Sequence, residues 1–338
     1  MTFLTQYWAD LSQLFSNSQQ RLFWGYWCCA IVIAVIFWLK DHYFKQEKAI
    51  NKPSLVSYLG LKHFTSRSAI ADYQLIAINK AIFLLFSPYL LTKLVIATAI
   101  FEYLHTITTP LSFYTTAIPT PAVMVIFTVW LFLLDDFARF YFHKIMHDIP
   151  WLWQFHKVHH SATSLTPLSV LRTHPVEGLI FTLRSAFVQG ISISVFIFCF
   201  GSRVDLYTLL NLNILVFMFN VAGSNLRHSH VAISYWPQLE KLLISPAQHH
   251  IHHSTNPVHF NKNYGAILAV WDNLANTLCL SKKGQPLSYG LNKNQCAKEH
   301  QLLTLYFSPF VHIYRSITKY LKRGIGGKAN TDSTLNKN

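Results

Sequence analysis

Five apolar stretches divide this chain and limit what it can fold into. They lie at about 22–39, 81–100, 121–134, 179–200 and 206–221. The first is about long enough to cross a bilayer as a helix, because a membrane-spanning helix needs roughly 20 apolar residues. Lys40 and Asp41 follow it without a small-residue cleavage site, which favours a retained span over a signal peptide. The polar turn 201–203 joins the last two stretches into a predicted helical hairpin.

Composition agrees with a membrane location. Of 338 residues, 51% are hydrophobic and only 12% are charged, and the mean hydropathy is +0.26. A usual soluble domain carries about twice that share of charged residues to cover its surface. The sequence therefore predicts an all-α membrane protein with about four to five transmembrane helices.

The charged residues that are present are mostly basic. Lys and Arg number 28 against 14 Asp and Glu, which gives a formal net charge of +14. The basic residues gather at 40–67 and 315–328, next to apolar stretches, and form no stripe interleaved with aromatic residues. This placement favours contact with anionic lipid headgroups over a nucleic-acid partner.

The basic residues also predict an orientation. The segment 40–80 holds seven of them, whereas 101–120 holds none. The seven are Lys40, Lys45, Lys48, Lys52, Lys62, Arg67 and Lys80. Basic loops stay on the cytoplasmic side, so 40–80 is predicted to be cytoplasmic. Counting five spans onward places 135–178 and 222–338, including the C-terminus, on the same side.

We expect three parts along the chain. Residues 1–110 form N-terminal transmembrane helices with a basic loop, 111–285 form a catalytic domain, and 286–338 form a C-terminal segment. The last residues of that segment, Gly326 to Asn338, are small and polar and are predicted to be a disordered tail. The five cysteines show no CxxC spacing, which argues against a disulfide framework.

Histidines form the clearest chemical pattern. Thirteen of the 18 fall between His143 and His259, and ten of these are clustered. The first box is HxxxH, two later boxes are HxxHH, and one pair lies between the two. The ten candidate ligands are His143 and His147; His156, His159 and His160; His228 and His230; and His249, His252 and His253.

This spacing suits metal binding. Side chains three and four residues apart on a helix point in one direction, so their imidazoles can share one ion or bind two neighbouring ions. Ten imidazoles suit two metal ions with about five nitrogen ligands each, and are far too many for one tetrahedral zinc. Imidazole binds iron, copper, zinc and nickel alike, so the ligand type alone leaves the metal open. We therefore predict a helical cap that carries a histidine-rich dinuclear site.

With these boxes in order, the chain resembles the fatty acid hydroxylase superfamily, also called the sterol desaturase family, over about residues 120–280. Flanking motifs carry the resemblance further. They are Asp136-Phe-Ala-Arg139, Trp153-Gln-Phe-His156-Lys-Val-His159-His160-Ser161, Arg172-Thr-His174-Pro175-Val-Glu177, Ser245-Pro-Ala-Gln-His249, Asn263-Tyr264-Gly265 and Trp271-Asp272. The resemblance implies two iron ions, O₂ and a membrane enzyme that hydroxylates a C–H bond of a lipid or sterol-like substrate, with desaturation as the alternative.

The chain departs from the family pattern at one place. Many relatives carry a histidine a few residues before an Asn-x-Arg element, where this chain has Gly223-Ser-Asn225-Leu-Arg227. His228 and His230 are the candidates to replace it. Four further residues are candidates near the metal: His174, Asp136, Asp272 and Asn225. His174 is expected to be a ligand, a donor or a structural residue. Asp136 and Asp272 are expected to be ligands, acceptors that orient imidazoles (the preferred interpretation), or simple caps or ion pairs. Arg172 and Glu177 are expected to be either a structural ion pair or catalytic residues.

Electrons for such a reaction need an outside source. The sequence contains no GxGxxG nucleotide motif, no CxxCH haem attachment and no iron–sulfur cysteine run. A separate reductase with a ferredoxin or cytochrome is therefore the predicted partner, docking at the basic cytoplasmic face. Two other classes remain open from the residues: a membrane metal transporter or sensor, and a non-catalytic scaffold that retains the fold.

Overall fold

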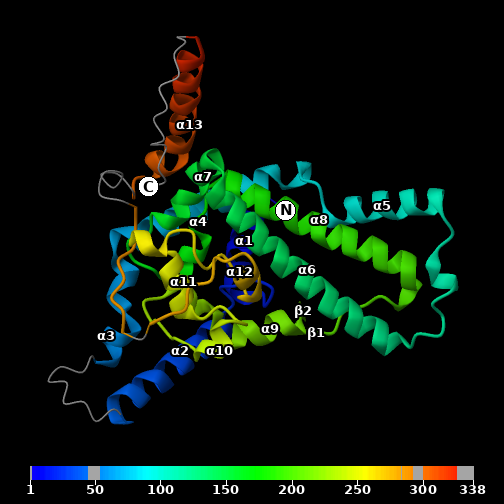
Figure 1. Cartoon of the computed structure of the whole chain (residues 1–338), viewed down its shortest axis with the longest axis horizontal. Coiled ribbons are helices and arrows are strands. Elements are labelled where there is room, and N and C mark those ends of the chain that lie inside the picture. The colour runs from blue at the N-terminus through cyan, green and yellow to red at the C-terminus, as the bar shows by residue number, and fades with distance from the viewer. Residues whose placement is uncertain (1, 45–53, 283, 292–299, 326–338) are drawn as a thin grey trace.

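Helices make up most of the described chain, and its paired strands form one short hairpin (Figure 1). The computed structural model describes residues 2–44, 54–282, 284–291 and 300–325. Its helices are α1 (Phe3–Ser16), α2 (Trp24–Leu39), α3 (Leu55–Leu59), α4 (Arg67–Phe86), α5 (Lys93–Ile107), α6 (Thr120–Asp148), α7 (Pro150–His160), α8 (Pro175–Phe200), α9 (Ile214–Val221), α10 (Pro237–Glu240), α11 (Pro246–His252), α12 (Val270–Leu274) and α13 (Leu302–Ile325). Strands β1 (Thr208–Leu209) and β2 (Leu212–Asn213) pair antiparallel.

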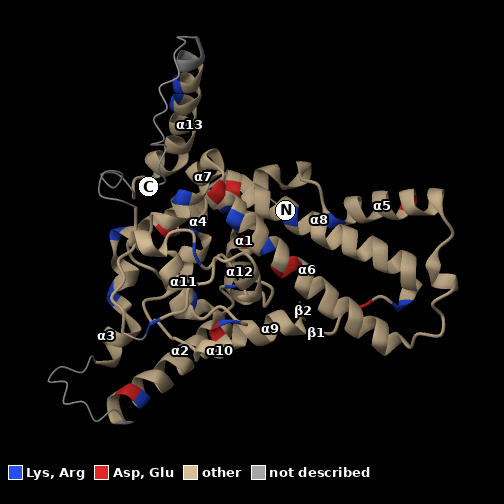
Figure 2. Ribbon diagram, in the orientation of Figure 1, with Lys and Arg blue, Asp and Glu red and all other residues tan. Residues whose placement is uncertain are grey.

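Four segments among the described residues are long and apolar enough to cross a membrane. They are Trp24–Tyr43, Arg67–Ile107, Thr120–Asp148 and Pro175–Arg203. Figure 2 shows few charged residues along the parts of α6 and α8 that lie far from the histidine boxes, and residues 104–134 and 185–202 contain no Lys, Arg, Asp or Glu. The predicted all-α membrane protein with four to five spans is confirmed. The domain boundaries at 110 and 285 stay a prediction.

The fifth predicted span, 206–221, is wrong. This stretch folds as the β1–β2 hairpin followed by the eight-residue helix α9. Leu210 and Asn211 adopt positive φ angles at the turn, and the Asn213 side chain caps α9 by accepting from Leu215 N. The asparagines therefore supply a turn and a cap where a continuous helix was expected. Tyr207 N donates to Thr128 Oγ1 at 2.9 Å, so the returning chain packs along α6.

The second predicted span, 81–100, is interrupted. Helix α4 ends at Phe86, a short 3₁₀ turn with Pro88 follows, and Thr92 caps the start of α5. Pro88 has no backbone N–H to continue the helical hydrogen bonds, and its ring crowds the preceding turn, which explains the break. Lys93 is consequently the exposed first residue of α5 and does not lie inside an apolar helix.

Close helix packing holds the long helices together. A Cβ atom on Gly190 of α8 would lie 2.7 Å from Ile96 Cγ2 of α5, so only glycine permits this approach. Arg184 of α8 pairs with Asp135 of α6 at 2.8 Å, and the arginine side chain is buried. These contacts fix α8 against both neighbours and set the place where α6 and α8 meet the histidine boxes.

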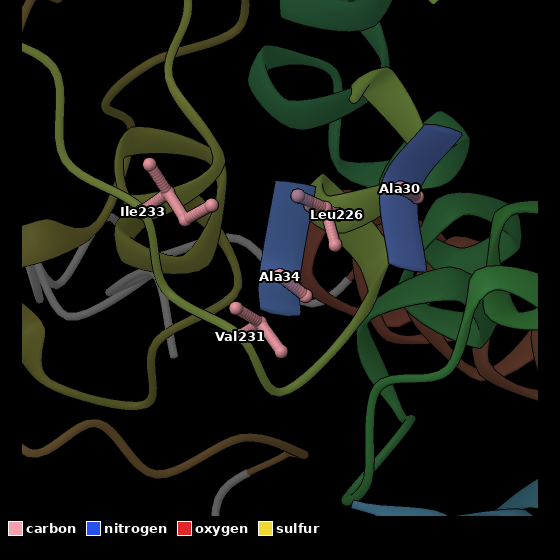
Figure 3. Packing of buried hydrophobic residues seen from close by; sticks show 5 residues of the cluster. All are labelled: Ala30, Ala34, Leu226, Val231 and Ile233. Atoms are coloured by element: carbon pink, nitrogen blue, oxygen red, sulfur yellow. The ribbon is translucent and has the colours of Figure 1, made fainter. Parts of the chain in front are cut away.

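Helix α2 supports the loop that precedes the last histidine box. Ala30 and Ala34 of α2 pack against Leu226, Val231 and Ile233, and all five are buried (Figure 3). The small alanine side chains let the loop approach the helix closely. Packing on α2 therefore positions the backbone around His228.

Candidate metal centre

Helix α6 runs past the predicted end of its apolar stretch, and its last two turns carry the first histidine box. His143 and His147 lie four residues apart and share one side of the helix, with ring centroids 5.2 Å apart. Pro150 begins α7, a position that tolerates proline because its missing N–H has no partner there. The chain turns back at this point and brings His156 Nε2 within 3.1 Å of His143 Nε2.

Helix α11 presents the last box. Ser245 and Gln248 form a reciprocal capping box: Ser245 Oγ accepts from Gln248 N at 3.1 Å, and Gln248 Oε1 accepts from Ser245 N at 2.9 Å. This pair fixes where the short helix begins. It thereby fixes the direction of His249, His252 and His253, all buried.

His228 comes from the 3₁₀ turn Ser224–His228 that packs on α2. Its Nε2 lies 3.2 Å from His159 Nε2 of α7 and 3.1 Å from His249 Nε2 of α11. Three segments distant in sequence therefore meet at one point.

The clustered histidines form two groups. In each group one nitrogen of every ring lies within 4.8 Å of the others. Group A consists of His143, His147, His156, His160 and His252. Group B consists of His159, His228, His249 and His253. The groups adjoin, because the rings of His160 and His253 stack with centroids 4.6 Å apart. Nine of the ten predicted ligands are thus brought together.

Backbone carbonyls orient two rings of group A. His143 Nδ1 donates to Tyr264 O at 2.7 Å, and His252 Nδ1 donates to Lys262 O at 2.8 Å. A carbonyl oxygen only accepts, so these contacts place the proton on Nδ1 and leave the Nε2 lone pair free. The extended loop before α12 thereby prepares two ligands for a metal.

A carboxylate orients a third ring. His156 Nδ1 donates to Glu177 Oε1 at 2.8 Å, and both side chains are buried. The other carboxylate oxygen of Glu177 is buried without a hydrogen-bond partner in the described part of the chain. A carboxylate behind an imidazole fixes its tautomer and raises its basicity as a metal ligand.

Group B has fewer such contacts. His159 Nδ1 reaches the Arg172 carbonyl at 3.3 Å. Nδ1 of His249 and of His253 is buried without a hydrogen-bond partner among the described residues. The rings of group B are therefore less tightly oriented than those of group A.

The nitrogen atoms fit a metal pair. In group A, Nε2 of His147, His160 and His252 is buried without a hydrogen-bond partner in the described residues. Such atoms are costly in a folded protein unless something binds them. Two nitrogens bound to one ion at about 2.1 Å and at right angles lie roughly 3 Å apart. The Nε2–Nε2 distances of 3.1 and 3.2 Å in the two groups match that separation.

Burial keeps the imidazoles uncharged. It lowers the pKa of His159 to about 3, and the pKa values of His160, His252 and His253 also fall well below the usual 6.5. Removing an imidazolium from water is unfavourable, and neighbouring imidazoles add to the effect. Near neutral pH these rings are neutral, which is the form that binds metal ions.

Two predicted candidates lie outside both groups. His230 stacks on His63, with ring centroids 5.0 Å apart, instead of joining His228. His174 caps the start of α8 by accepting from Val176 N at 3.1 Å, and its Nε2 donates to Tyr306 O at 3.1 Å. The structure brings neither ring to the metal groups.

The two predicted aspartates hold backbone. Asp136 accepts from the N–H groups of Ile267 and Leu268 at 2.9 and 3.0 Å. Asp272 accepts from the N–H groups of Tyr264 and Gly265 at 2.8 and 2.7 Å. The preferred prediction was that these carboxylates accept from imidazole N–H groups. Among the described residues they accept from backbone N–H groups instead. Asp272 acts on group A indirectly: it accepts from Tyr264 N, and the carbonyl of Tyr264 orients the ring of His143.

Asn225 also stays outside both groups. It lies in the turn that ends at His228 and is buried, and its Nδ2 has no hydrogen-bond partner among the described residues. Its predicted place beside the metal site therefore remains a prediction.

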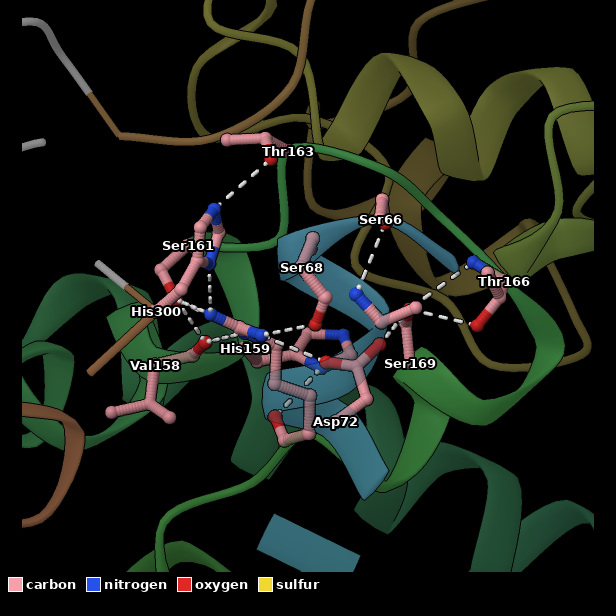
Figure 4. Close-up of polar contacts among 12 residues, drawn as sticks. Ser66, Ser68, Asp72, Val158, His159, Ser161, Thr163, Thr166, Ser169 and His300 are labelled. Atoms are coloured by element: carbon pink, nitrogen blue, oxygen red, sulfur yellow. Dashed lines mark hydrogen bonds and ion pairs between the residues drawn. The ribbon is translucent and has the colours of Figure 1, made fainter. Parts of the chain in front are cut away.

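Arg172 and Glu177 do not pair with each other. Arg172 Nη1 pairs with Asp72 of α4 at 2.8 Å, and Arg172 Nε donates to Val158 O of α7 at 3.0 Å (Figure 4). Asp72 Oδ2 accepts a hydrogen bond from Ser169 at 2.6 Å. This buried network ties α4 to α7 beside His159. Sequence reasoning missed Asp72, because a single aspartate in an apolar helix carries no motif.

Comparisons with known proteins agree with this geometry. Residues 128–277 match the fatty acid hydroxylase family. An alkylglycerol monooxygenase of Caenorhabditis elegans is 24% identical over 57% of this chain and 35% of its own length. A Delta(7)-sterol 5(6)-desaturase, ERG3B, of Gibberella zeae is 26% identical over 44% of this chain and 41% of its own.

A bacterial relative extends the range. The ornithine lipid hydroxylase OlsE of Rhizobium tropici is 28% identical over 43% of this chain and 39% of its own length. The matched part thus covers roughly a third to two fifths of these relatives. No solved structure matches the chain. The family match contains all nine converging histidines, from His143 to His253. Residues 128–277 are therefore similar to the fatty acid hydroxylase family, and this part of the chain holds the two histidine groups.

Proposed function

We propose that this protein is a membrane-bound oxidoreductase that uses O₂ and electrons from another protein to hydroxylate a C–H bond of a lipid. One observation carries the proposal: nine imidazoles, seven of them buried and two half-buried, converge into two adjoining groups within the part of the chain that matches the fatty acid hydroxylase family. The relatives support a lipid substrate, since their names include an alkylglycerol monooxygenase and an ornithine lipid hydroxylase.

The metal we propose is a pair of iron ions, one in each group. Imidazole nitrogens alone suit several transition metals, so the choice of iron rests on the family. Bound iron would supply the redox chemistry that activates O₂ toward an unactivated C–H bond. Group A would contribute five nitrogen ligands and group B four.

The chain's own residues prepare the site for this chemistry. The carbonyls of Tyr264 and Lys262 and the carboxylate of Glu177 hold protons on Nδ1 of three rings, so that Nε2 faces the metal. Seven of the nine rings are buried, which limits the access of water to these ligands. Oriented, shielded ligands need little rearrangement during the reaction.

The substrate would approach from the bilayer. The site lies where α6 ends and α8 begins, at the ends of two candidate spans. An acyl or sterol-like chain can reach this level without leaving an apolar environment. How closely the reacting carbon is held decides between adding oxygen and removing a second hydrogen. Desaturation is the second candidate, and the sterol desaturase relative favours it.

We further propose that the site and the C-terminus face the cytoplasm, where an electron donor would dock on basic residues. Residues 206–221 form no spanning helix, but the chain still returns along α6 and brings His228 within 3.2 Å of His159, and α13 packs against α7. His159, His228 and α13 therefore lie at one end of the spans. Among the described residues Lys62 and Arg67 are exposed near the start of α4. Lys45, Lys48 and Lys52, which also support this orientation, lie outside the described residues. Labelling of residue 62 from the cytoplasmic side only is expected, and labelling from the other side only would reverse the orientation.

Lipid analysis of cells is the test of the activity. Cells that produce the wild-type protein should accumulate lipids with one added oxygen, or with two hydrogens lost if desaturation occurs. Cells that produce His252→Ala at equal membrane abundance should not. Identical lipid profiles in both, with an electron donor supplied, would refute the proposed oxidation.

A further inference from the structure

Helix α13 has one face packed on the protein. Leu305 packs against Ala71 and Leu75 of α4, and Tyr306 donates to Asn79 Oδ1 at 2.8 Å. Ile313 packs with the cluster formed by α6 and α7. This face accounts for the first half of the helix. The second half extends beyond the rest of the molecule (Figure 1).

A second face of α13 is apolar and exposed. Its side chains recur every three or four residues along the whole helix, which places them in one stripe at 3.6 residues per turn. They are Leu303, Phe307, Phe310, Tyr314, Ile317 and Leu321. Tyr314 is 69% exposed and Leu321 59%, so neither is covered by the described part of the chain. A stripe of this length on a water-facing helix is unfavourable unless something covers it.

The third face carries positive charge. Arg315 and Lys319 are exposed and lie four residues apart, about 100° or more around the helix from the apolar stripe. Helices that lie in a membrane surface combine an apolar stripe with basic residues at its flank, where long side chains reach the headgroups. The charge therefore points to an anionic lipid surface.

The position of α13 places the stripe at the edge of the bilayer. The ring of Phe310 lies 5.5 Å from His174, which caps the first turn of α8, and 5.3 Å from Phe155 of α7. Helix α8 is a candidate span, so α13 lies level with the end of a span. In Figure 1 the projecting half of α13 runs across the direction of α5 and α8, as a helix in the membrane plane would.

We propose that α13 lies in the headgroup region of an anionic lipid leaflet, with the stripe from Leu303 to Leu321 toward the acyl chains and Arg315 and Lys319 toward the phosphates. The contact adds an attachment in the membrane plane to the attachment that the spanning helices provide. It also supports α7, which supplies ligands to both histidine groups and packs directly against α13. The assignment does not depend on any oxidation chemistry.

Site-specific fluorescence tests this placement in the full-length protein. A fluorescent amino acid is introduced at Ile317, on the stripe, or at Lys319, as the matched control on the other side of the helix. The protein is reconstituted in bilayers of phosphatidylcholine with phosphatidylglycerol. Quenchers attached near the top of the acyl chains should reduce the emission at 317 at least about threefold more than at 319. A water-soluble quencher should show the reverse order.

Two other results would overturn the proposal. Equal quenching by the aqueous agent at both positions would mean that the helix lies in water. Shielding of 317 from both quenchers would mean that protein covers the stripe, for example a second copy of this chain.

The double variant Arg315→Gln/Lys319→Gln tests the charge. It should reduce the difference in lipid quenching between anionic and purely zwitterionic bilayers. Circular dichroism and size-exclusion chromatography are measured in parallel to show that the variant is folded. If anionic lipid makes no difference for the wild-type protein, the charged part of the contact is wrong.

Discussion

Groups A and B are built from the same side chain but are held differently. Three rings of group A donate Nδ1 protons at 2.7–2.8 Å, two to carbonyls and one to a buried carboxylate. In group B one ring reaches a carbonyl at 3.3 Å, and two have no Nδ1 partner among the described residues. Acceptors behind an imidazole fix its direction and strengthen metal binding. We therefore expect a tighter metal site in A and a more adaptable one in B.

Loss of a ligand should have the largest effect in either group. His252→Ala in group A or His159→Ala in group B should lower activity by more than about 100-fold, because even residues that only orient ligands cost about 10- to 100-fold. Bound metal should fall as well, while the protein still inserts into membranes. His230→Ala is the matched control, since His230 lies outside both groups. Full turnover of either ligand variant would show that its group is not the catalytic site.

Removing the carboxylate behind His156 should weaken group A selectively. Glu177→Gln keeps the size of the side chain but replaces the carboxyl group behind His156 with an amide, which is a weaker acceptor. Metal affinity of group A should fall about 10- to 100-fold, while that of group B changes little. Metal titration followed by spectroscopy measures both sites. Glu102→Gln, an exposed position on α5, is the control. Equal weakening of both sites would contradict the division into two groups.

Graded removal of metal should reveal an order. A chelator should take the ion from group B first, because B offers four ligands against five and fewer oriented rings. We expect affinities that differ by about tenfold or more, from the acceptor contacts alone. Metal analysis after each chelator step should show a plateau near one ion per chain. Removal of both ions in a single step, or earlier loss from group A, would contradict the claim that group A binds its ion more tightly.

The Asp72–Arg172 pair should affect group B more than group A. Asp72→Asn removes the charge that faces a buried guanidinium, which costs about 3 kcal/mol in the free energy of unfolding. The carbonyl of Arg172 also contacts His159, so metal occupancy of group B should drop. Unfolding in a denaturing detergent and metal analysis measure the two effects. Asp10→Asn, which breaks a partly exposed pair with Lys80, should cost about 1 kcal/mol or less. Equal effects of the two variants would show that the Asp72–Arg172 pair does not support group B.

Acid should destabilise the metal-free protein, and each buried histidine adds to the loss. Burial lowers the pKa of the histidines in α7 and α11, so the unfolded chain binds protons near pH 6.5 that the folded chain does not bind. The stability that these histidines contribute is present above pH 6.5 and falls as the pH drops below it, by up to about 1.4 kcal/mol per pH unit for each proton. Denaturation at pH 7.5 and 5.5 measures the change. No loss of stability in the metal-free form would show that the rings are not buried as described.

Box spacing predicted most of the site because it depends only on helix geometry. His143 and His147, and the two HxxHH boxes, lie in or at the end of helices, where residues three and four apart share a side. Local backbone geometry also explains why His228 joins group B and His230 does not. His228 ends a 3₁₀ turn, whereas Ser229 after it is extended, with φ −134° and ψ −179°, so neither helical nor extended periodicity relates the directions of His228 and His230.

Other parts of the fold depend on contacts that spacing does not encode. Glu177 reaches His156 only because the start of α8 packs beside α7, and Asp72 reaches Arg172 from a helix about 100 residues earlier in the chain. Hydropathy located α2, α6 and α8 but ran across the break between α4 and α5. It merged the β1–β2 hairpin and α9 into one span, because it averages over the two asparagines that make the turn and the cap.

The most direct test of the account is the metal content of the full-length protein purified in mild detergent. We predict close to two iron ions per chain, with O₂ uptake when the protein is reduced. We also predict a drop to about one ion in His249→Ala, because that change removes a ligand from group B alone. Protein that is folded and membrane-inserted but binds no stoichiometric iron under reducing, iron-replete conditions would contradict the central claim.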